Sequence, residues 1–359
     1  MKRIYLDHNA TAPLRAEARD AMVDAMNVVG NPSSVHAEGR AAKAIVERAR
    51  AQVGALVGVD PHEVIFTSGA TESAALAALG RRLVCADIEH DAVVAHQAAA
   101  LHVDEHGTIL PFDVLDGDLI AVQGANSETG VLQDTFRWAQ SAWAHGAHVL
   151  VDAVQLAGKV PTSVAGLGAD SLMMSAHKLG GPKGIGALCL KLGVDLPALI
   201  PGGGQEMGRR SGTENVIGIA GFGAAAAAAQ RDIEAGAWDR VAQLRNILEF
   251  TLAEASPMTI FVGKEVPRLP NTSCFITPGW KGETQVMQMD LAGFAISAGS
   301  ACSSGKVKAS RVLQAMGHAQ ADAACAVRVS LGPDTTEEDI MRFAETWAQK
   351  LNKHQARAA

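Results

Sequence analysis

Short apolar runs alternate with amphipathic stretches along the first half of the chain. The apolar runs predict strands at residues 63–67, 83–86, 119–123, 148–152 and 186–190. The intervening stretches have helical periodicity and predict helices at residues 15–27, 34–57, 71–79 and 135–145. Strands that alternate with helices are typical of an α/β fold, in which helices cover a mainly parallel sheet.

The pattern changes after Asn215, where the chain becomes Ala-rich and predicts a long helical region to about residue 256. A second α/β section follows, with predicted strands near residues 272–276, 295–297 and 326–330. A closing helix is predicted from Thr336, because Thr336 and Asp339 have the spacing of a capping box.

Composition and charge exclude several classes of protein. The 359 residues are 48% hydrophobic and 19% charged, which is typical of a globular protein of about two domains. The net charge of −7, without a long basic block, argues against nucleic acid as a direct substrate. No long uncharged apolar run predicts a membrane span, and the N-terminus lacks the apolar core of a signal peptide.

The five cysteines are scattered without a Cys-x-x-Cys pair, which argues against a disulfide framework or a structural zinc site. A reducing cytoplasm fits this pattern best. The apolar runs around three of them predict core positions for Cys85, Cys189 and Cys325, and Cys274 lies in a predicted strand.

Candidate chemistry is densest in the stretch Ser175-Ala-His-Lys-Leu-Gly-Gly-Pro-Lys-Gly184. Upstream, the predicted strand at residues 148–152 ends in Asp152. Lysine, aspartate, hydroxyl and imidazole are the groups that hold pyridoxal 5'-phosphate (PLP), which proteins bind as a Schiff base with an acidic partner for the ring nitrogen. The stretch therefore indicates a PLP site with Lys178 at its centre.

Two further segments suit such a cofactor. Asp152 ends a buried strand, the edge where open α/β sheets place ligands, and Gln155 is spaced to reach the ring's phenolic oxygen. A helix N-cap is the alternative for Asp152. Residues 64–73 predict a strand that breaks at Ser68-Gly69 before a helix N-terminus, which favours a phosphate. An ordinary strand–turn–helix capped by Thr71 is the alternative there.

Three more side chains have the chemistry of a reaction site. His90 follows a strand in a polar turn, where an imidazole could stack on a ring and move protons, or be merely structural. Cys302 lies in a Gly/Ser-rich stretch that favours an accessible nucleophile, with an incidental surface thiol as the alternative. Arg328 stands among apolar strand residues and needs a partner, either a substrate carboxylate or a structural salt bridge.

Nine motifs in register resemble one family over essentially the whole chain. They are Tyr5-Leu-Asp-His-Asn-Ala-Thr11, Gly30-Asn-Pro-Ser-Ser-Val-His36, Thr67-Ser-Gly-Ala-Thr-Glu-Ser73, Val151-Asp-Ala-Val-Gln155, residues 175–184, Gly202-Gly-Gly-Gln205, Arg210-Ser-Gly-Thr213, Ser300-Ala-Cys-Ser-Ser304 and Arg328-Val-Ser-Leu-Gly332. The chain resembles the NifS/IscS-type cysteine desulfurases, which are fold-type I PLP enzymes of the class V aminotransferase group.

This resemblance implies a role for each matching cofactor residue. Lys178 matches the Schiff-base lysine, Asp152 the partner of the ring nitrogen, Gln155 the partner of the ring oxygen and His90 the stacking histidine. The implied phosphate ligands are the backbone at Ala70 and the side chains of Thr71, Ser175, His177 and Thr213. In the family the threonine that matches Thr213 comes from the other subunit, which implies a homodimer.

The resemblance also implies the substrate and the reaction. Arg328, with Asn126 and Ser127, matches the residues that bind the substrate, and Cys302 matches the cysteine that receives sulfur from L-cysteine. The implied enzyme is a cytoplasmic cysteine desulfurase that passes a persulfide to an acceptor protein, as in iron–sulfur cluster assembly. A selenocysteine lyase, a small class V aminotransferase and a non-catalytic scaffold of the same fold are the alternatives.

The family implies a fold-type I PLP-dependent transferase: a large domain with a mainly parallel seven-stranded sheet between helices, and a smaller α/β C-terminal domain. The expected large domain is residues 15–256, and residues 1–14 and 257–359 form the small domain. Three features depart from the family. Ser127 replaces a second Asn, Met207 replaces a common Arg, and the segment before His90 is shorter than usual.

Overall fold

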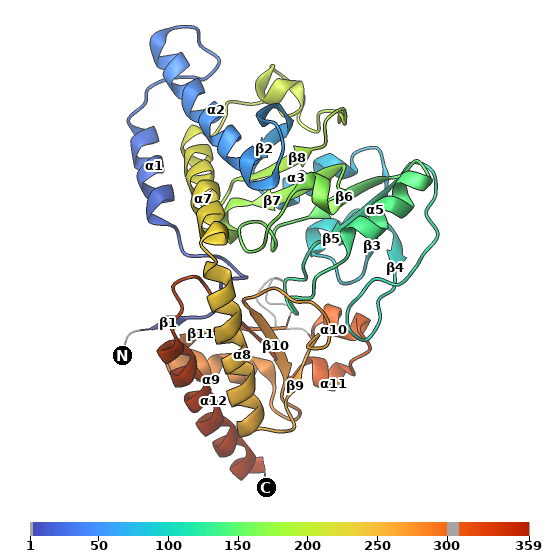
Figure 1. Ribbon diagram of the computed structural model, residues 1–359, viewed down its shortest axis with the longest axis vertical. Coiled ribbons are helices and arrows are strands. Elements are labelled where there is room, and N and C mark those ends of the chain that lie inside the picture. Colours follow the sequence, from blue (N-terminus) through green and yellow to red (C-terminus); the bar gives the residue numbers. More distant parts are fainter. Residues whose placement is uncertain (1–2, 300–308, 359) are drawn as a thin grey trace.

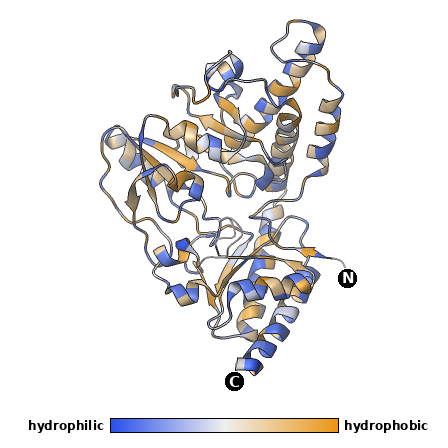
Figure 2. Ribbon diagram, turned by 180° about the vertical axis from the view of Figure 1, so that it is seen from behind, coloured by the Kyte–Doolittle hydropathy of each residue, from blue (hydrophilic) through white to orange (hydrophobic). Residues whose placement is uncertain are grey.

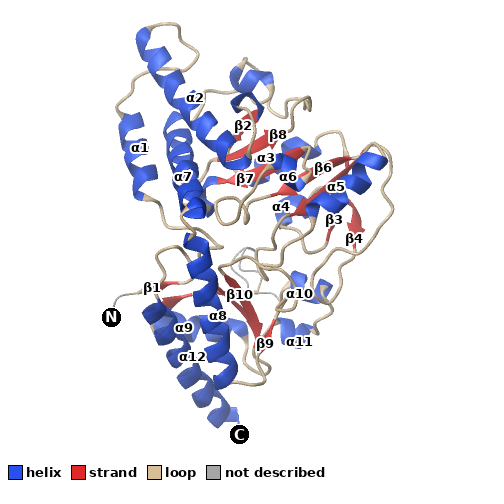
Figure 3. Ribbon diagram, in the orientation of Figure 1, coloured by secondary structure: helices blue, strands red, loops and turns tan. Residues whose placement is uncertain are grey.

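The computed structural model describes residues 3–299 and 309–358 of the chain. A large sheet and its helices form the upper part of the molecule in Figure 1, and a smaller sheet with its own helices lies below. Figure 3 shows helices beside the strands in both parts. The expected α/β class is confirmed.

The large sheet has seven strands in the order β2-β8-β7-β6-β5-β3-β4. Strands β4, β3, β5, β6 and β7 are parallel, and β8 is antiparallel to both of its neighbours, β7 and β2. The bounds are β2 Val64–Thr67, β3 Arg82–Ala86, β4 Gln97–Leu101, β5 Asp118–Gln123, β6 His148–Asp152, β7 Ser171–Ser175 and β8 Gly186–Leu190. The expectation of a mainly parallel seven-stranded sheet is therefore confirmed.

Both faces of this sheet are buried, which explains why its strands are continuous apolar runs rather than alternating ones. In β6, Val149 and Val151 pack into one hydrophobic cluster and Leu150 packs into another on the opposite face. Figure 2 shows mainly hydrophobic central strands beneath helices of mixed hydropathy.

Helices from both ends of the large-sheet region cover one face, and shorter helices cover the other. Buried residues of four helices join the first cluster: α1 Ala16–Met26, α2 Ala37–Val57, α5 Thr135–Ala144 and α7 Val216–Glu234. The second cluster includes residues of α3 Ala70–Ala78 and α4 Asp91–Val94. Short helical turns also occur at Pro61–Glu63, Val164–Leu167 (α6), Ala176–Lys178 and Gln205–Gly208.

The smaller sheet is antiparallel, in the order β12-β13-β10-β9, and β1 pairs with β11 in a separate parallel ribbon. The bounds are β1 Ile4–Tyr5, β9 Ile260–Phe261, β10 Thr272–Ile276, β11 Phe294–Ala295, β12 Ser297–Ala298 and β13 Ala326–Ser330. Its helices are α8 Ala237–Ala255, α9 Gly282–Leu291, α10 Arg311–Ala315, α11 Gln320–Ala323 and α12 Glu337–Ala358.

A separate hydrophobic core joins this sheet to α8, α12 and the N-terminal strand. It contains Leu6, Trp238, Leu248, Phe275 and Trp347, all of them buried. The packing of Leu6 supports grouping the first residues with the C-terminal part. Because α8 also packs into this core, a domain boundary at residue 256 stays a prediction.

The predicted long helical region after Asn215 contains two helices, α7 and α8. They are separated at Gly236, whose φ of 69° lies in the left-handed region that glycine adopts most easily. The predicted capping box of α12 is confirmed, since Thr336 N donates to Asp339 Oδ2 at 3.0 Å and Asp339 N donates to Thr336 Oγ1 at 3.2 Å.

The three predicted core cysteines, Cys85, Cys189 and Cys325, are buried, as is Cys274, and none of these four forms a disulfide with another. Burial raises the pKa of the Cys85, Cys189 and Cys274 thiols to about 12, so none of these three is a ready nucleophile. No helix in the described ranges combines the length and apolar character needed to cross a membrane.

Candidate active site

A cavity of about 610 Å³ lies where the large sheet, the N-terminal segment and β13 meet. The sequence-predicted residues that line it come from both parts of the molecule. They are Ala70, Thr71, His90, Ser127, Asp152, Gln155, Ser175, His177, Lys178 and Arg328. The carboxyl ends of β5, β6 and β7 contribute Gln123, Asp152 and Ser175, at the edge where open α/β sheets bind ligands.

Lys178 ends the helical turn that follows β7. Its Nζ donates to two backbone carbonyl oxygens of the N-terminal segment, Asn9 O at 2.7 Å and Ala10 O at 2.9 Å. The amine is therefore held at the cavity wall by a segment distant in sequence.

Asp152 is the last residue of β6, and its Oδ1 accepts a hydrogen bond from Val154 N at 2.9 Å. Burial raises the pKa of this carboxyl, and the hydrogen bond and the electrostatic interactions with His90 and Lys178 oppose the rise only in part. A further cation in the cavity would stabilise the ionised carboxylate. The protonated nitrogen of a pyridine ring is such a cation.

His90 caps the short helix α4, where its Nδ1 accepts from Ala92 N at 3.1 Å. Because Nδ1 accepts this bond, the neutral ring carries its proton on Nε2. The cap fixes the turn from which the imidazole lines the cavity.

One end of the cavity suits an anion. Ala70 and Thr71 form the first turn of α3, whose N-terminal N–H groups and dipole favour negative charge. Lys183, which the sequence reasoning did not single out, also lines the cavity. His177 Nδ1 lies 3.2 Å from Thr11 Oγ1, and burial, together with the charges of Lys178 and Lys183, lowers its pKa to about 4. His177 is therefore neutral at pH 7.

Arg328 lies in the middle of β13 and forms a structural salt bridge, one of the two alternatives left open by the sequence. Its guanidinium donates to Asp7 Oδ1 at 2.7 Å and to Ser127 O at 2.9 Å, and it also lines the cavity. Its Nε has no hydrogen-bond partner among the described residues. The arginine is thus oriented by a structural ion pair while it remains at the cavity wall.

Ser127, which replaces the family's second Asn, and its neighbour Asn126 have different surroundings. Ser127 lines the cavity, and its carbonyl oxygen accepts from both Arg328 and Asn9. Asn126 is buried behind the cavity, where its Oδ1 accepts from Glu128 N and Thr129 N and its Nδ2 donates to Ile88 O. A direct contact between Asn126 and a substrate stays a prediction, and the observed bonds shape the turn that presents Ser127.

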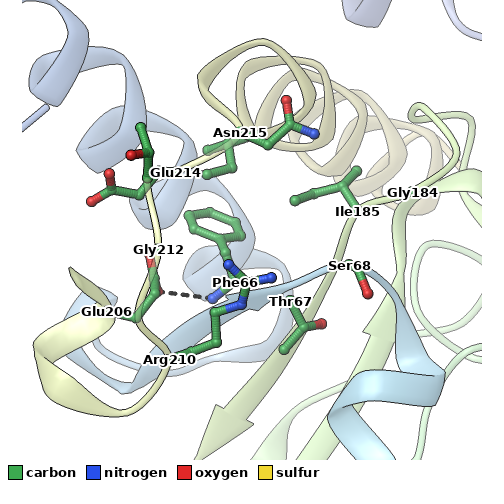
Figure 4. Close-up of a pocket in the computed structure, with 12 residues that line it drawn as sticks. Phe66, Thr67, Ser68, Gly184, Ile185, Glu206, Arg210, Gly212, Glu214 and Asn215 are labelled. Atoms are coloured by element: carbon green, nitrogen blue, oxygen red, sulfur yellow. Dashed lines mark hydrogen bonds between the residues drawn. The ribbon is translucent and has the colours of Figure 1, made fainter. Parts of the chain in front are cut away.

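Thr213 does not line the large cavity of its own chain. It lines a second cavity of about 260 Å³, which shares Ser68 and Gly184 with the first (Figure 4). The carboxylate of Glu206 lies beside this second cavity and accepts from Phe66 N at 2.9 Å, the bond dashed in Figure 4.

The segment before Thr213 is fixed by a buried ion pair. Arg50 donates from both terminal nitrogens to Glu206, at 2.6 and 2.8 Å. Glu206 and Met207 both have positive φ, 48° and 57°, which costs free energy for residues other than glycine. Met207, the family departure, is half exposed at 46%.

Cys302 lies outside the described residues. Its predicted role is therefore carried by the sequence alone.

Comparisons with known proteins agree with this arrangement. The family model "Aminotransferase class-V" matches residues 4–343. The chain is 39% identical to a cysteine desulfurase of Cereibacter sphaeroides, covering 96% of this chain and 95% of that protein. It is 36% identical to the cysteine desulfurase IscS of Dictyoglomus turgidum, covering 95% and 92%. The chain belongs to the class V aminotransferase family.

Solved structures of the class V family share the whole fold. The X-ray structure of a NifS-like protein from Rickettsia africae superimposes with a TM-score of 0.89 at 31% identity, over 98% of this chain and 99% of that one. A second NifS-like protein gives a TM-score of 0.87 at 31% identity, over 98% and 99%. The expected fold-type I architecture is confirmed.

Class V aminotransferases of this NifS-like type use PLP, and the cavity has groups that fit it. An amine for the aldehyde, a carboxylate for the ring nitrogen and a helix N-terminus for the phosphate all face one space: Lys178, Asp152 and α3. The carboxylate whose pKa burial raises is the group that a cationic ring nitrogen would stabilise.

Two buried charged residues of this class V site escaped the sequence reasoning. Glu89 is buried directly before His90, its Oε1 accepts from Gln123 N at 2.5 Å, and burial raises its pKa well above the usual range. Lys159 is buried behind Gln155. Two sequence signals could have found them: Glu89 is adjacent to His90, and Lys159 lies four residues after Gln155.

Proposed function

We propose that this chain is a PLP-dependent cysteine desulfurase, which converts L-cysteine to L-alanine and passes the sulfur to an acceptor protein. The observation that carries the proposal is the convergence of Lys178, Asp152 and Arg328 on one cavity, in a family whose similar members are cysteine desulfurases. The amine, the carboxylate and the guanidinium suit an amino acid bound next to the cofactor.

The cofactor-facing residues bind different parts of PLP. Lys178 anchors it covalently, Asp152 keeps the ring nitrogen protonated, and Gln155 donates to the ring oxygen. The first turn of α3 with Thr71, Ser175 and His177 holds the phosphate, and His90 stacks on the ring. When bound, PLP supplies an electron sink for the negative charge that develops at Cα.

Arg328 orients the substrate through its carboxylate. A planar guanidinium can bind a carboxylate with two parallel hydrogen bonds, and Asp7 and Ser127 O already fix its plane. Lys178 Nζ is the base that takes the proton from Cα. His90 is the general acid–base residue that transfers the thiol proton.

Cys302 is the proposed sulfur carrier. Its thiolate attacks the sulfur of the substrate, so that an Sγ–S bond forms as the Cβ–S bond breaks. The electron pair of the broken bond stays with the carbon fragment, which takes up a proton at Cβ, recovers a proton at Cα from Lys178 and leaves as alanine. The persulfide on Cys302 then donates its outer sulfur to an acceptor of the iron–sulfur assembly type.

A homodimer in the cytoplasm is the proposed setting. Thr213 is exposed and lies away from the large cavity of its own chain, which supports its use as a phosphate ligand for a second subunit. Free cysteines such as Cys85 and Cys189 are typical of a reducing compartment.

The test is the product balance from L-cysteine with a thiol reductant. Equimolar alanine and sulfide from the PLP-loaded wild type, and neither from Cys302→Ala, would support the proposal. Retained sulfide release by Cys302→Ala would contradict the role of Cys302. Nitrogen transfer to a keto acid without sulfide would favour the aminotransferase alternative, and a strong preference for selenocysteine would favour the lyase.

A further inference from the structure

Lys159 is a buried lysine to which the proposed function assigns no role. Its exposed fraction is 3%, and it is absent from the lining of the cavity that contains Lys178. Its Nζ donates to Gln155 Oε1 at 2.6 Å and to Asn9 Oδ1 at 3.3 Å. Within residues 3–299 and 309–358, it contacts amide oxygens and forms no ion pair.

The electrostatic surroundings of Lys159 are unfavourable. Burial and the positive charges of Lys178 and Arg328 lower its pKa well below the usual range. Lys159 in turn acts on His8, whose pKa is lowered to about 4, chiefly by burial. A buried amine without a counter-ion destabilises a fold, so a compensating role is expected for it.

The hydrogen bonds of Gln155 show that Lys159 helps to fix the orientation of the Gln155 side-chain amide. Gln155 Nε2 donates to Asn9 O at 3.0 Å, and a carbonyl oxygen can only accept. On the other side, Lys159 Nζ donates to Gln155 Oε1. Both partners select the same amide orientation, because a flipped amide would place Oε1 against the Asn9 carbonyl and Nε2 against a lysine donor.

Asn9 is itself held rigidly, so it is a fixed reference for this amide. Its backbone N donates to Ser330 Oγ at 3.0 Å, and its Nδ2 donates to Thr272 Oγ1 at 2.8 Å. Its carbonyl oxygen also accepts from Lys178 Nζ at 2.7 Å. One network of hydrogen bonds therefore joins Lys159, Gln155 and Lys178.

We propose that Lys159 is a positioning residue, which holds the Gln155 side chain with its NH₂ group available to the cavity and the ring oxygen of bound PLP. This inference rests on the proposed function, because it needs PLP in the cavity. Gln155 lines the cavity, and one hydrogen of Nε2 is used by Asn9 O while the amide has a second. Without Lys159 the amide can rotate and present its oxygen instead.

The experiment measures the pH midpoint at which the absorbance of the lysine-bound cofactor changes. A donor to the ring oxygen stabilises its negative charge and so weakens the hold on the neighbouring imine proton. Lys159→Met should therefore raise the midpoint by about 0.5–1 pH unit, the equivalent of one ordinary hydrogen bond. Gln155→Leu should raise it in the same direction. Lys191→Met is the control, since that lysine is about half exposed, pairs with Asp170 and does not line the cavity, and its midpoint should equal that of the wild type.

A double-variant cycle distinguishes positioning from an independent effect. If Lys159 acts through Gln155, the double variant should have the midpoint of Gln155→Leu alone. Additive shifts, or a wild-type midpoint in Lys159→Met or Gln155→Leu, would overturn the inference. Lys159→Gln retains an amide donor and should return the midpoint toward the wild-type value, and it replaces Lys159→Met in the cycle if the latter does not fold.

The absorbance band itself needs Lys178 and not Lys159. A wild-type protein that forms no Lys178-dependent band would therefore overturn the proposed function together with this inference. A normal band with the wrong pattern of midpoints would overturn the inference alone.

Discussion

Two buried arginine–carboxylate pairs in this chain have similar chemistry and different consequences. In the Arg50 anchor, made of Arg50 and Glu206, every guanidinium nitrogen of Arg50 has a hydrogen-bond partner, so we call this pair closed even though both residues line a cavity of about 570 Å³. The Arg328 pair, made of Arg328 and Asp7, is open: the arginine lines a cavity, and its Nε has no partner in the described part of the chain. We therefore expect the pair with every donor used to serve stability, and the pair with an unused donor to serve ligand binding.

The largest expected effect is the loss of activity when Lys178, which lines the same cavity as Arg328, is replaced. Lys178→Ala should abolish the lysine-bound cofactor band and reduce alanine formation by several orders of magnitude, because its Nζ both anchors PLP and accepts the Cα proton. Absorbance titration with PLP and product assays measure these losses. An unchanged spectrum would refute the role of Lys178.

The closed pair should dominate stability. Arg50→Met leaves the Glu206 carboxylate buried without its partner, which should lower the free energy of unfolding by about 3–5 kcal/mol. The matched control is Arg231→Met, which removes an exposed pair with Glu17 and should cost about 1 kcal/mol or less. Denaturant unfolding measures both, and equal losses would contradict the distinction between buried and exposed pairs.

The open pair should dominate substrate binding. Arg328→Lys keeps the charge and loses the planar fork, so the KM for L-cysteine should rise about tenfold or more, whereas kcat changes less. Its loss of unfolding free energy should be smaller than that of Arg50→Met. A wild-type KM combined with a large loss of stability would make the Arg328 pair a second anchor.

The arginines of the Arg50 and Arg328 pairs stay charged in acid. We therefore expect histidines to be responsible for a loss of stability as pH decreases. His8 and His177 have pKa values of about 4 in the folded chain, below the ordinary value of 6.5. The unfolded chain therefore binds more protons between these pH values, and stability falls as pH decreases through that window. After allowance for partial exposure, the loss at pH 5 should be about 1 kcal/mol per histidine.

This pH prediction is tested with the protein prepared without PLP. Unfolding curves at pH 7 and pH 5 give the slope, and His177→Asn should reduce it. A slope that stays unchanged in His177→Asn would show that this imidazole is not the group that titrates.

The sequence predicted more of the site than of its supporting contacts. Lys178, Asp152 and Gln155 stand at the ends of strongly apolar strands or within dense motifs, so local pattern placed them correctly beside one cavity. Asp7 and Asn9 could not be assigned in this way, because their partners Arg328 and Thr272 are more than 250 positions distant. Long-range hydrogen bonds leave little trace in local periodicity.

The missed strands have a similar explanation. Strand β7 has only three apolar residues between Ser171 and Ser175, and β4 contains three consecutive alanines, which favour helix. Both become strands because neighbouring strands offer hydrogen bonds and buried surface. Tertiary context, which one sequence window does not contain, decided these two elements.

The most direct test of the account is the location of the sulfur after a single turnover of PLP-loaded protein with L-cysteine and no reductant. The account predicts one added sulfur atom, by peptide mass, on the peptide that contains Cys302, with one alanine released, and sulfur addition about tenfold slower in Arg328→Lys at low substrate. Alanine release with sulfur on another cysteine, or sulfur released without any bound intermediate, would contradict it.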